Sequence, residues 1–184
     1  VLEQYPDGTL FVDLFGGSGL LSHITKSLKP HSTVIYNDFD NYRFRMKHIP
    51  QTNQLLADIR EMVGNSVPRH KIIKGELRER IFSRIEQEEN STGYVDFITL
   101  SSSILFSMKY KLSVQDMRKE DLYNNIRKTG YPECTDYLEG LEIVSCDYKE
   151  VFNRYKDIPE VVFLVDPPYL STDVGTYNMY WNMI

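Results

Sequence analysis

The strongest constraint on the fold is a strand–turn–helix–strand pattern near the N-terminus. Four consecutive segments carry it: the apolar strand LFVDLF (10–15), the turn GGSG (16–19), the helix LLSHITKSLK (20–29) and the strand TVIYND (33–38). The apolar residues of this helix share one face, which consists of Leu20, Leu21, Ile24 and Leu28. Such a pattern opens a βαβ unit, whose strands are parallel. We expect Asp40 to cap a further helix that begins near Asn41.

A second constrained stretch, VVFLVDPPYL (161–170), lies much later in the chain. Its first five residues are apolar and indicate a buried strand. Proline cannot continue a sheet ladder and pushes the preceding residue into an extended conformation, so the strand should stop at Asp166. Ligands of open α/β sheets bind at the carboxyl ends of the strands, and we therefore expect Asp166 to lie at a binding edge.

A long segment of different character separates these two stretches. Helical periodicity predicts helices over 71–88, over 113–130 (closed by Gly130) and over 149–156, and strand character returns over 141–147. The apolar, serine-rich stretch 95–107 fits a helix or a strand equally well. Strands that flank a mainly helical segment indicate a domain inserted into an α/β sheet. We predict a discontinuous catalytic domain over 1–55 and 138–184, and an inserted domain over 56–137.

Composition excludes several classes of protein. A chain of 184 residues with 41% hydrophobic residues can bury a core, and no apolar run approaches the roughly 18 residues of a membrane span. Cys134 and Cys146 are too few for a disulfide framework or a metal cluster, so we expect reduced thiols and no metal. The net charge is −5, but residues 41–140 hold 16 of the 21 Lys and Arg and 14 of the 26 Asp and Glu. That distribution would suit a protein that touches phosphates with one part only, although ordinary variation of surface charge explains it equally well.

The glycine turn and Asp38 together predict an adenosine-containing cofactor. Glycines let the backbone turn tightly and approach a ligand, and the following helix offers its positive N-terminal end. Asp38 ends the next strand, where a carboxylate accepts the hydroxyls of a ribose in dinucleotide-binding proteins. Ser22 stands where a nicotinamide-binding fingerprint has its third small residue, which disfavours that cofactor.

The DPPY turn predicts the recognition of an amino group. Asp166 and the carbonyl of Pro167 would form two neighbouring acceptors, which suit an exocyclic amine of a nucleobase. Tyr169 would offer a flat face on which the base stacks. A purely structural Pro-Pro turn is the alternative.

FGGSG fits the pattern F-x-G-x-G, and with DPPY it resembles the S-adenosylmethionine-dependent amino-methyltransferases. The order of cofactor motif, second-strand acid, large insert and D-P-P-Y is similar to that of the Dam-like (D12-class, alpha-type) DNA adenine N6-methyltransferases of bacteria and phages. The stretch DPPYLSTDVGTYNMYW extends the resemblance, because phage members carry a tyrosine-rich loop after the catalytic turn. Compared with the family pattern, we expect this chain to be truncated at both ends.

The resemblance implies an α/β fold with a Rossmann-like, mostly parallel sheet of the methyltransferase type and a large helical insertion that recognises the target. It implies S-adenosylmethionine as cofactor, bound by Asp13, Phe15, Gly16, Gly17, Gly19, Asp38, Asp147, Tyr148 and Asp166. The implied catalytic residues are Asp166, Pro167, Pro168 and Tyr169. The residues expected to contact DNA are Arg118, Lys119, Arg127, Lys128 and Tyr177.

The implied reaction is methyl transfer to the exocyclic 6-amino group of adenine in a specific sequence of double-stranded DNA. The base would flip out of the duplex to reach the site, and no metal or membrane would be involved. We expect a monomeric, cytoplasmic, bacterial or phage-encoded enzyme, of the kind found in restriction-modification. The alternatives are an RNA or other amino-methyltransferase that uses the same turn, and a non-catalytic DNA-binding remnant of the fold.

Overall fold

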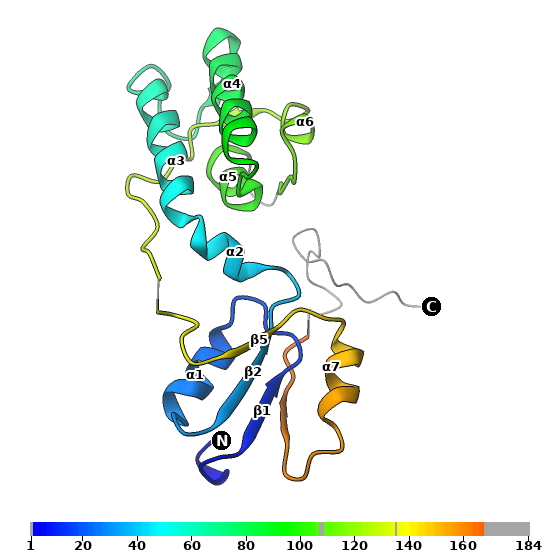
Figure 1. The fold of residues 1–184 in the computed structure, drawn as a ribbon. Helices are drawn as coiled ribbons and strands as arrows, with labels where there is room; N and C mark the ends of the chain where they lie inside the picture. The colour runs from blue at the N-terminus through cyan, green and yellow to red at the C-terminus, as the bar shows by residue number, and fades with distance from the viewer. Residues whose placement is uncertain (1, 107–108, 135, 168–184) are drawn as a thin grey trace. The chain divides into compact units, whose positions relative to one another are not determined.

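The computed structural model describes residues 2–106, 109–134 and 136–167 of the chain. The chain divides into two compact units, one formed by Val1–Met46 with Cys134–Ile184 and the other by Lys47–Glu133. The second unit begins at Lys47, nine residues before the predicted start of the insert at 56. The first unit resumes at Cys134, four residues before the predicted return at 138. Figure 1 shows the described elements of both units.

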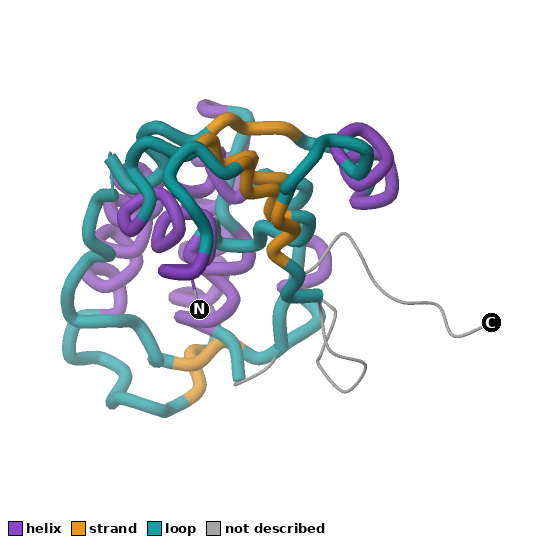
Figure 2. Tube along the Cα trace, turned by 90° about the horizontal axis from the view of Figure 1, so that it is seen from below, coloured by secondary structure: helices purple, strands orange, loops and turns teal. Residues whose placement is uncertain are grey.

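The first unit is built on a four-stranded sheet (Figures 1 and 2). In spatial order its strands are β5 (Glu142–Val144), β2 (Thr33–Asn37), β1 (Leu10–Asp13) and β6 (Val162–Leu164). All three pairings are parallel, which confirms the predicted fold class. From β1 the chain proceeds through β2 to β5 on one side, whereas β6 pairs with the other side of β1. This reversal of strand order makes a topological switch point, where α/β sheets form a ligand crevice.

Helices cover both faces of this sheet. Phe11 and Val34 pack with Leu21 of α1 (Leu20–Leu28), whereas the next residues along the same strands, Val12 and Ile35, pack with Val151 of α7 (Tyr148–Tyr155). Successive side chains of a strand point to opposite faces, so α1 and α7 lie on opposite sides of the sheet. Strands buried on both faces explain the continuous apolar runs in the sequence. A short 3₁₀ turn, η1 (Leu2–Gln4), precedes β1.

The apolar face predicted for α1 is not the face that the helix buries. Leu20, Ile24 and Leu28 are 55%, 42% and 62% exposed, whereas Ser22 and Thr25 are fully buried. The small buried residues allow a close approach to the sheet, and their hydroxyl groups are satisfied. Ser22 Oγ donates to Asp13 Oδ2, and Thr25 Oγ1 donates to the carbonyl of Leu21. The hydrogen bond from Ser22 therefore joins the buried face of this helix to the end of β1.

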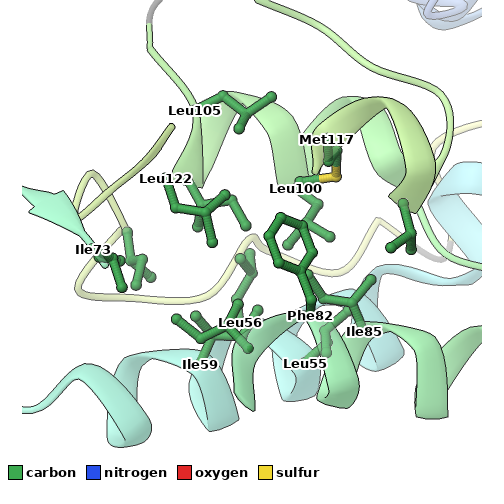
Figure 3. Packing of buried hydrophobic residues seen from close by; sticks show 14 of the residues in the cluster. Leu55, Leu56, Ile59, Ile73, Phe82, Ile85, Leu100, Leu105, Met117 and Leu122 are labelled. Carbon is green, nitrogen blue, oxygen red and sulfur yellow. The ribbon is translucent and has the colours of Figure 1, made fainter. Parts of the chain in front are cut away.

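The second unit is mainly helical, as predicted. After α2 (Tyr42–Lys47), which crosses the boundary between the units, its elements are α3 (Ile49–Val63), β3 (Ile72–Ile73), α4 (Gly75–Thr92), α5 (Phe97–Ile104), α6 (Val114–Met117) and β4 (Leu122–Tyr123). Its core packs α3 against α4 and closes over them with residues of α5, α6 and β4 (Figure 3). The fully buried members include Leu56, Ile59, Phe82, Ile85 and Leu100. The undecided stretch 95–107 thus contains a helix, α5, which Asp96 caps by accepting from Thr99 N.

Two predicted helices of this unit differ from the structure. The helix predicted over 71–88 is α4, shifted to Gly75–Thr92, because Ile72–Ile73 pairs with Leu122–Tyr123 as an antiparallel strand. The same pairing makes the helix predicted over 113–130 wrong, since only Val114–Met117 is helical. Tertiary pairing overrides the helical periodicity in both places.

Candidate active site

The four strands end at one edge of the sheet, and the residues that follow them gather there. β1 ends at Asp13, β2 leads to Asp38, β5 leads to Asp147 and β6 leads to Asp166. Leu14 N donates to the carbonyl of Leu164 at 3.2 Å, so β1 and β6 run together up to the switch point. The structure thus brings together residues predicted to bind the cofactor and the base, which the sequence places more than 100 positions apart.

The glycine turn is shaped by the ring of Tyr36. A Cβ on Gly16 would overlap the edge of this ring and would lie 2.7 Å from the carbonyl oxygen of Asn37. Gly19 has a φ of 76°, and a Cβ there would lie 2.7 Å from Leu138 Cδ2. Gly19 N donates to the carbonyl of Gly16 at 2.7 Å, which closes the turn. Close packing against Tyr36 and Asn37 therefore requires glycine at position 16, whereas the left-handed backbone conformation favours glycine at position 19.

Tyr36 links this turn to Asp38. Its hydroxyl lies 2.8 Å from the carbonyl of Gly17 and 3.1 Å from Asp38 Oδ1, and its side chain is fully buried. Burial and the nearby carboxylates raise the pKa of this phenol, with burial the largest cause, so Tyr36 stays protonated and can donate. The sequence indicates Tyr36 only as a strand residue, because a tyrosine in an apolar strand gives no local signal of this role.

Asn37 joins the ends of three strands, a role that the sequence also did not indicate. Its Nδ2 donates to the carbonyls of Leu14 and Cys146, at 3.0 and 2.9 Å, and its Oδ1 accepts from Cys146 N at 3.1 Å. The amide thereby satisfies backbone groups beyond β1 and β5 where the ladders stop. This buried side chain stabilises the edge on which the site lies.

Asp38 is buried and already makes several hydrogen bonds. Its carboxylate accepts from the backbone N–H groups of Tyr42 and Arg43, the latter at 3.2 Å, and from Tyr36. The helix begins at Tyr42, near Asn41 as predicted, and Asp38 has a capping role at its start that the sequence did not indicate. One of the roughly four acceptor positions of a carboxylate remains available on Oδ2.

Asp13 is buried, and one of its two carboxylate oxygens has no hydrogen-bond partner among the described residues. Oδ2 accepts from Ser22 at 2.7 Å, whereas Oδ1 is buried and has no hydrogen-bond partner within the described chain. Burial raises the pKa of the Asp13 carboxyl to about 6, helped by the charge of Asp166 and opposed by the hydrogen bond from Ser22. A buried acceptor without a partner is costly, and such groups call for a specific explanation.

An aromatic pair stands beside these carboxylates. The rings of Phe15 and Tyr148 lie 4.9 Å apart with a 32° tilt, although Phe15 follows β1 and Tyr148 begins α7. Asp147 caps α7 by accepting from Lys149 N at 2.8 Å. The two rings, each only partly buried, give this side of the edge a flat apolar surface of the type on which a purine can lie.

The structure describes only the first half of the DPPY turn. Asp166 is exposed and Pro167 is partly buried, directly after β6. The predicted site residues Pro168, Tyr169 and Tyr177 lie outside the described residues.

The residues predicted to contact DNA have different surroundings. Arg118 forms ion pairs with Glu79 and Glu86 at 2.7 and 2.9 Å, and Lys119 forms one with Asp116 at 2.7 Å. Arg127 and Lys128 are exposed and belong to another part of the second unit. The guanidinium of Arg127 lies 4.2 Å from the centre of the Tyr131 ring.

Two further properties concern the described residues as a whole. Within them, no group of three or more His, Cys, Asp and Glu side chains is placed to hold a metal ion. No helix in this part of the chain is long and apolar enough to span a membrane.

A parallel α/β sheet with a glycine turn, a second-strand carboxylate and an Asp-Pro at its switch point is consistent with a methyltransferase fold. The family model for the D12 class N6 adenine-specific DNA methyltransferase matches residues 1–184. The chain belongs to this family.

A curated relative agrees with the family assignment. A protein of Haemophilus influenzae, whose name describes it as a methyltransferase, is 38% identical over 190 residues. The match covers all of this chain and 63% of that protein, so the chain spans less than two thirds of the length of the relative. A search of solved structures found no match.

Proposed function

We propose that the protein transfers a methyl group from S-adenosylmethionine to the 6-amino group of adenine in a specific sequence of double-stranded DNA. The observation that carries this proposal is the convergence of the glycine turn, Asp38 and Asp166 at one edge of the sheet. Membership of the D12 class supports adenine in DNA as the substrate.

The residues at the edge fit the methyl donor. The unpartnered Oδ1 of Asp13 lies beside the glycine turn and suits the ammonium group of the donor's methionine part. The free position on Asp38 suits a ribose hydroxyl, and the Phe15–Tyr148 pair suits the adenine, with Asp147 next to it. Backbone groups of Gly16, Gly17 and Gly19 permit close approach. S-adenosylmethionine, when bound, supplies an activated methyl group on a sulfonium.

The DPPY turn holds the acceptor amine. The lone pair of an adenine amine is delocalised into the ring, so the amine is a weak nucleophile. Hydrogen bonds from this amine to Asp166 and to the carbonyl of Pro167 favour a tetrahedral nitrogen, whose lone pair is available. Pro168 stiffens the turn, and Tyr169 stacks on the flipped base. Much of the rate then comes from positioning.

The second unit acts as the target-recognition part in this proposal, and Arg118, Lys119, Arg127, Lys128 and Tyr177 remain its predicted DNA contacts. The enzyme works as a cytoplasmic monomer encoded by a bacterium or phage. An RNA or other amino-methyltransferase is the second candidate, because the same turn would serve any exocyclic amine.

A methyl-transfer assay with labelled S-adenosylmethionine tests the proposal, with the natural full-length polypeptide as enzyme. Separate reactions contain duplex DNA, RNA or buffer without nucleic acid. We expect label in DNA, recovered as N6-methyladenine after digestion. Asp166→Ala should abolish transfer and retain binding of the duplex. The matched control is Asp157→Ala, which removes an exposed carboxylate in the loop before β6 and should leave turnover unchanged.

Label in RNA but not in DNA would favour the second candidate. Full turnover by a folded Asp166→Ala variant would exclude Asp166 from the reaction. In that case the DPPY turn would be structural, and the substitution would lower the melting temperature instead.

A further inference from the structure

Two segments of the second unit contain no carboxylate. Residues 62–75 and 122–132 together carry five Lys and Arg and no Asp or Glu. The other residues of Lys47–Glu133 carry nine Lys and Arg and twelve Asp and Glu. These two stretches, which are distant in the sequence, therefore carry a net charge of +5, whereas the remaining nine cations and twelve carboxylates of the unit give −3.

The fold places these two stretches side by side. His70 N donates to the carbonyl of Asn124, and Asn124 N donates to the carbonyl of Lys71, both at 2.9 Å. The side chain of Asn124 also donates to the carbonyl of Val67 at 2.7 Å. These bonds extend the short β3–β4 pairing and unite 67–71 with 124–128 in one surface, which we call the basic ledge.

The arginines at the basic ledge are held by neutral groups. Arg69 Nη1 donates to the carbonyl of Ile126, and Arg60 Nε, from α3, donates to the carbonyl of Arg127, both at 2.9 Å. Arg127 itself lies over the ring of Tyr131. Carbonyls and a ring orient these cations without neutralising them, so their charges remain available to an anion. Arg69 and Arg127 are exposed, as are Lys71 and Lys128.

Cations elsewhere in the second unit are largely neutralised. Arg84 pairs with Asp58 and Glu88 at 2.8 Å each, and Lys109 and Lys111 both pair with Glu120. Arg118 and Lys119 have carboxylate partners as described above. A phosphate at those positions would compete with a carboxylate already in place, whereas at the basic ledge it would meet cations without acidic partners in the described chain.

We propose that the basic ledge is the surface with which the second unit binds the phosphate backbone of DNA. The proposal rests on the proposed function for the choice of duplex DNA as the partner. Two arginines held by carbonyl contacts, together with the neighbouring exposed cations, suit a backbone that carries regularly spaced charges. Binding there releases condensed counterions. Arg127 and Lys128 carry the predicted contact, together with Arg60, Arg69 and Lys71, which the sequence analysis did not select.

The salt dependence of DNA binding tests this inference directly. We would measure the affinity of the full-length protein for a labelled duplex by fluorescence anisotropy from about 50 to about 200 mM salt. The double variant Arg127→Gln/Lys128→Gln should reduce the steepness of log K against log salt by about 2, about one unit for each lost phosphate contact. Binding should weaken equally for duplexes of any sequence.

The matched control is Lys109→Gln/Lys111→Gln, which changes the net charge by the same amount but removes cations that are paired with Glu120. Its salt slope should stay that of the wild type, and circular dichroism should show that both variants are folded. An unchanged slope for the Arg127/Lys128 variant would overturn the proposal. If the Arg127/Lys128 variant keeps the salt slope of the wild type but loses binding to phosphatidylserine vesicles, the proposal is also overturned. That outcome would assign the ledge to a membrane surface.

The result is independent of catalysis, because the slope reports phosphate contacts only. If the wild type binds duplex DNA with a steep slope but transfers no methyl group, the proposed function fails and the ledge proposal is still tested. If the wild type methylates DNA and the ledge variant keeps its slope, the ledge proposal fails alone.

Discussion

The ring of Tyr36 occupies the space next to Gly16 in which any other residue would place its side chain. A Cβ on Gly16 would overlap this ring and would approach the carbonyl oxygen of Asn37 to 2.7 Å. The same tyrosine reaches the carbonyl of Gly17 and the carboxylate of Asp38 with its hydroxyl group. Strand β2 therefore shapes the glycine turn after β1, and the two motifs behave as one structural element.

Gly16→Ala should destabilise the protein by about 1–3 kcal/mol or more, because the added methyl group forces the buried Tyr36 ring or the backbone to move. In a Tyr36→Leu background the same substitution should cost less, with a coupling of about 1 kcal/mol or more. Urea denaturation of the four proteins measures this cycle. Gly8→Ala is the control, since nothing lies within 4 Å of its added Cβ, and its cost should add to that of Tyr36→Leu. Strict additivity for Gly16 and Tyr36 would contradict the packing argument.

Asp13→Asn should change how stability depends on pH. Burial raises the pKa of Asp13 from 3.8 to about 6, so the folded state keeps a proton that the unfolded state has lost in this range. The contribution of Asp13 to stability is therefore largest below about pH 4, declines as the pH rises to about 6 and stays low above it. The variant lacks this decline. Its free energy of unfolding minus that of the wild type should therefore rise by about 3 kcal/mol from pH 4 to pH 7.

Urea denaturation across this pH range checks the prediction. Asp157→Asn is the control for an exposed carboxylate. The same variant should bind S-adenosylmethionine more weakly, because an amide cannot replace a carboxylate opposite an ammonium group. A constant stability difference from pH 4 to pH 7 would show that Asp13 does not titrate in this window.

Asp38→Asn should separate the binding role of Asp38 from its capping role. Asparagine keeps one oxygen that can accept from Tyr42 N, but its amide nitrogen cannot accept from Arg43 N, so the free energy of unfolding should fall by about 1–3 kcal/mol. The affinity for S-adenosylmethionine should fall by roughly 1–3 kcal/mol, the scale of hydrogen bonds to a charged acceptor. Isothermal titration calorimetry measures this loss. Asp96→Asn, the equivalent change at the cap of α5, should leave cofactor affinity unaltered. Equal affinities for Asp38→Asn and wild type would leave Asp38 with a capping role only.

The sequence alone determined the class of the fold and the edge on which the site lies. Continuous apolar runs that end in a glycine turn, an aspartate or an Asp-Pro identify buried parallel strands, because local chemistry decides where such strands stop. Asp13, Asp38 and Asp166 could therefore be placed at strand ends without knowledge of the sheet. The family resemblance of FGGSG and DPPY added an expectation of the type of cofactor.

Only the tertiary structure decided how distant residues meet. Periodicity predicted a helix over 113–130, but Leu122–Tyr123 pairs with Ile72–Ile73, and no local signal records that pairing. The same pairing creates the basic ledge, so the cations of 67–71 and 124–128 could not be recognised as one surface from the sequence. Likewise Tyr36 and Asn37 read as ordinary strand residues, because their roles depend on carbonyl groups of other strands. Side-chain periodicity reports which face of a segment is apolar, whereas the partner that covers it depends on contacts between segments far apart in the chain.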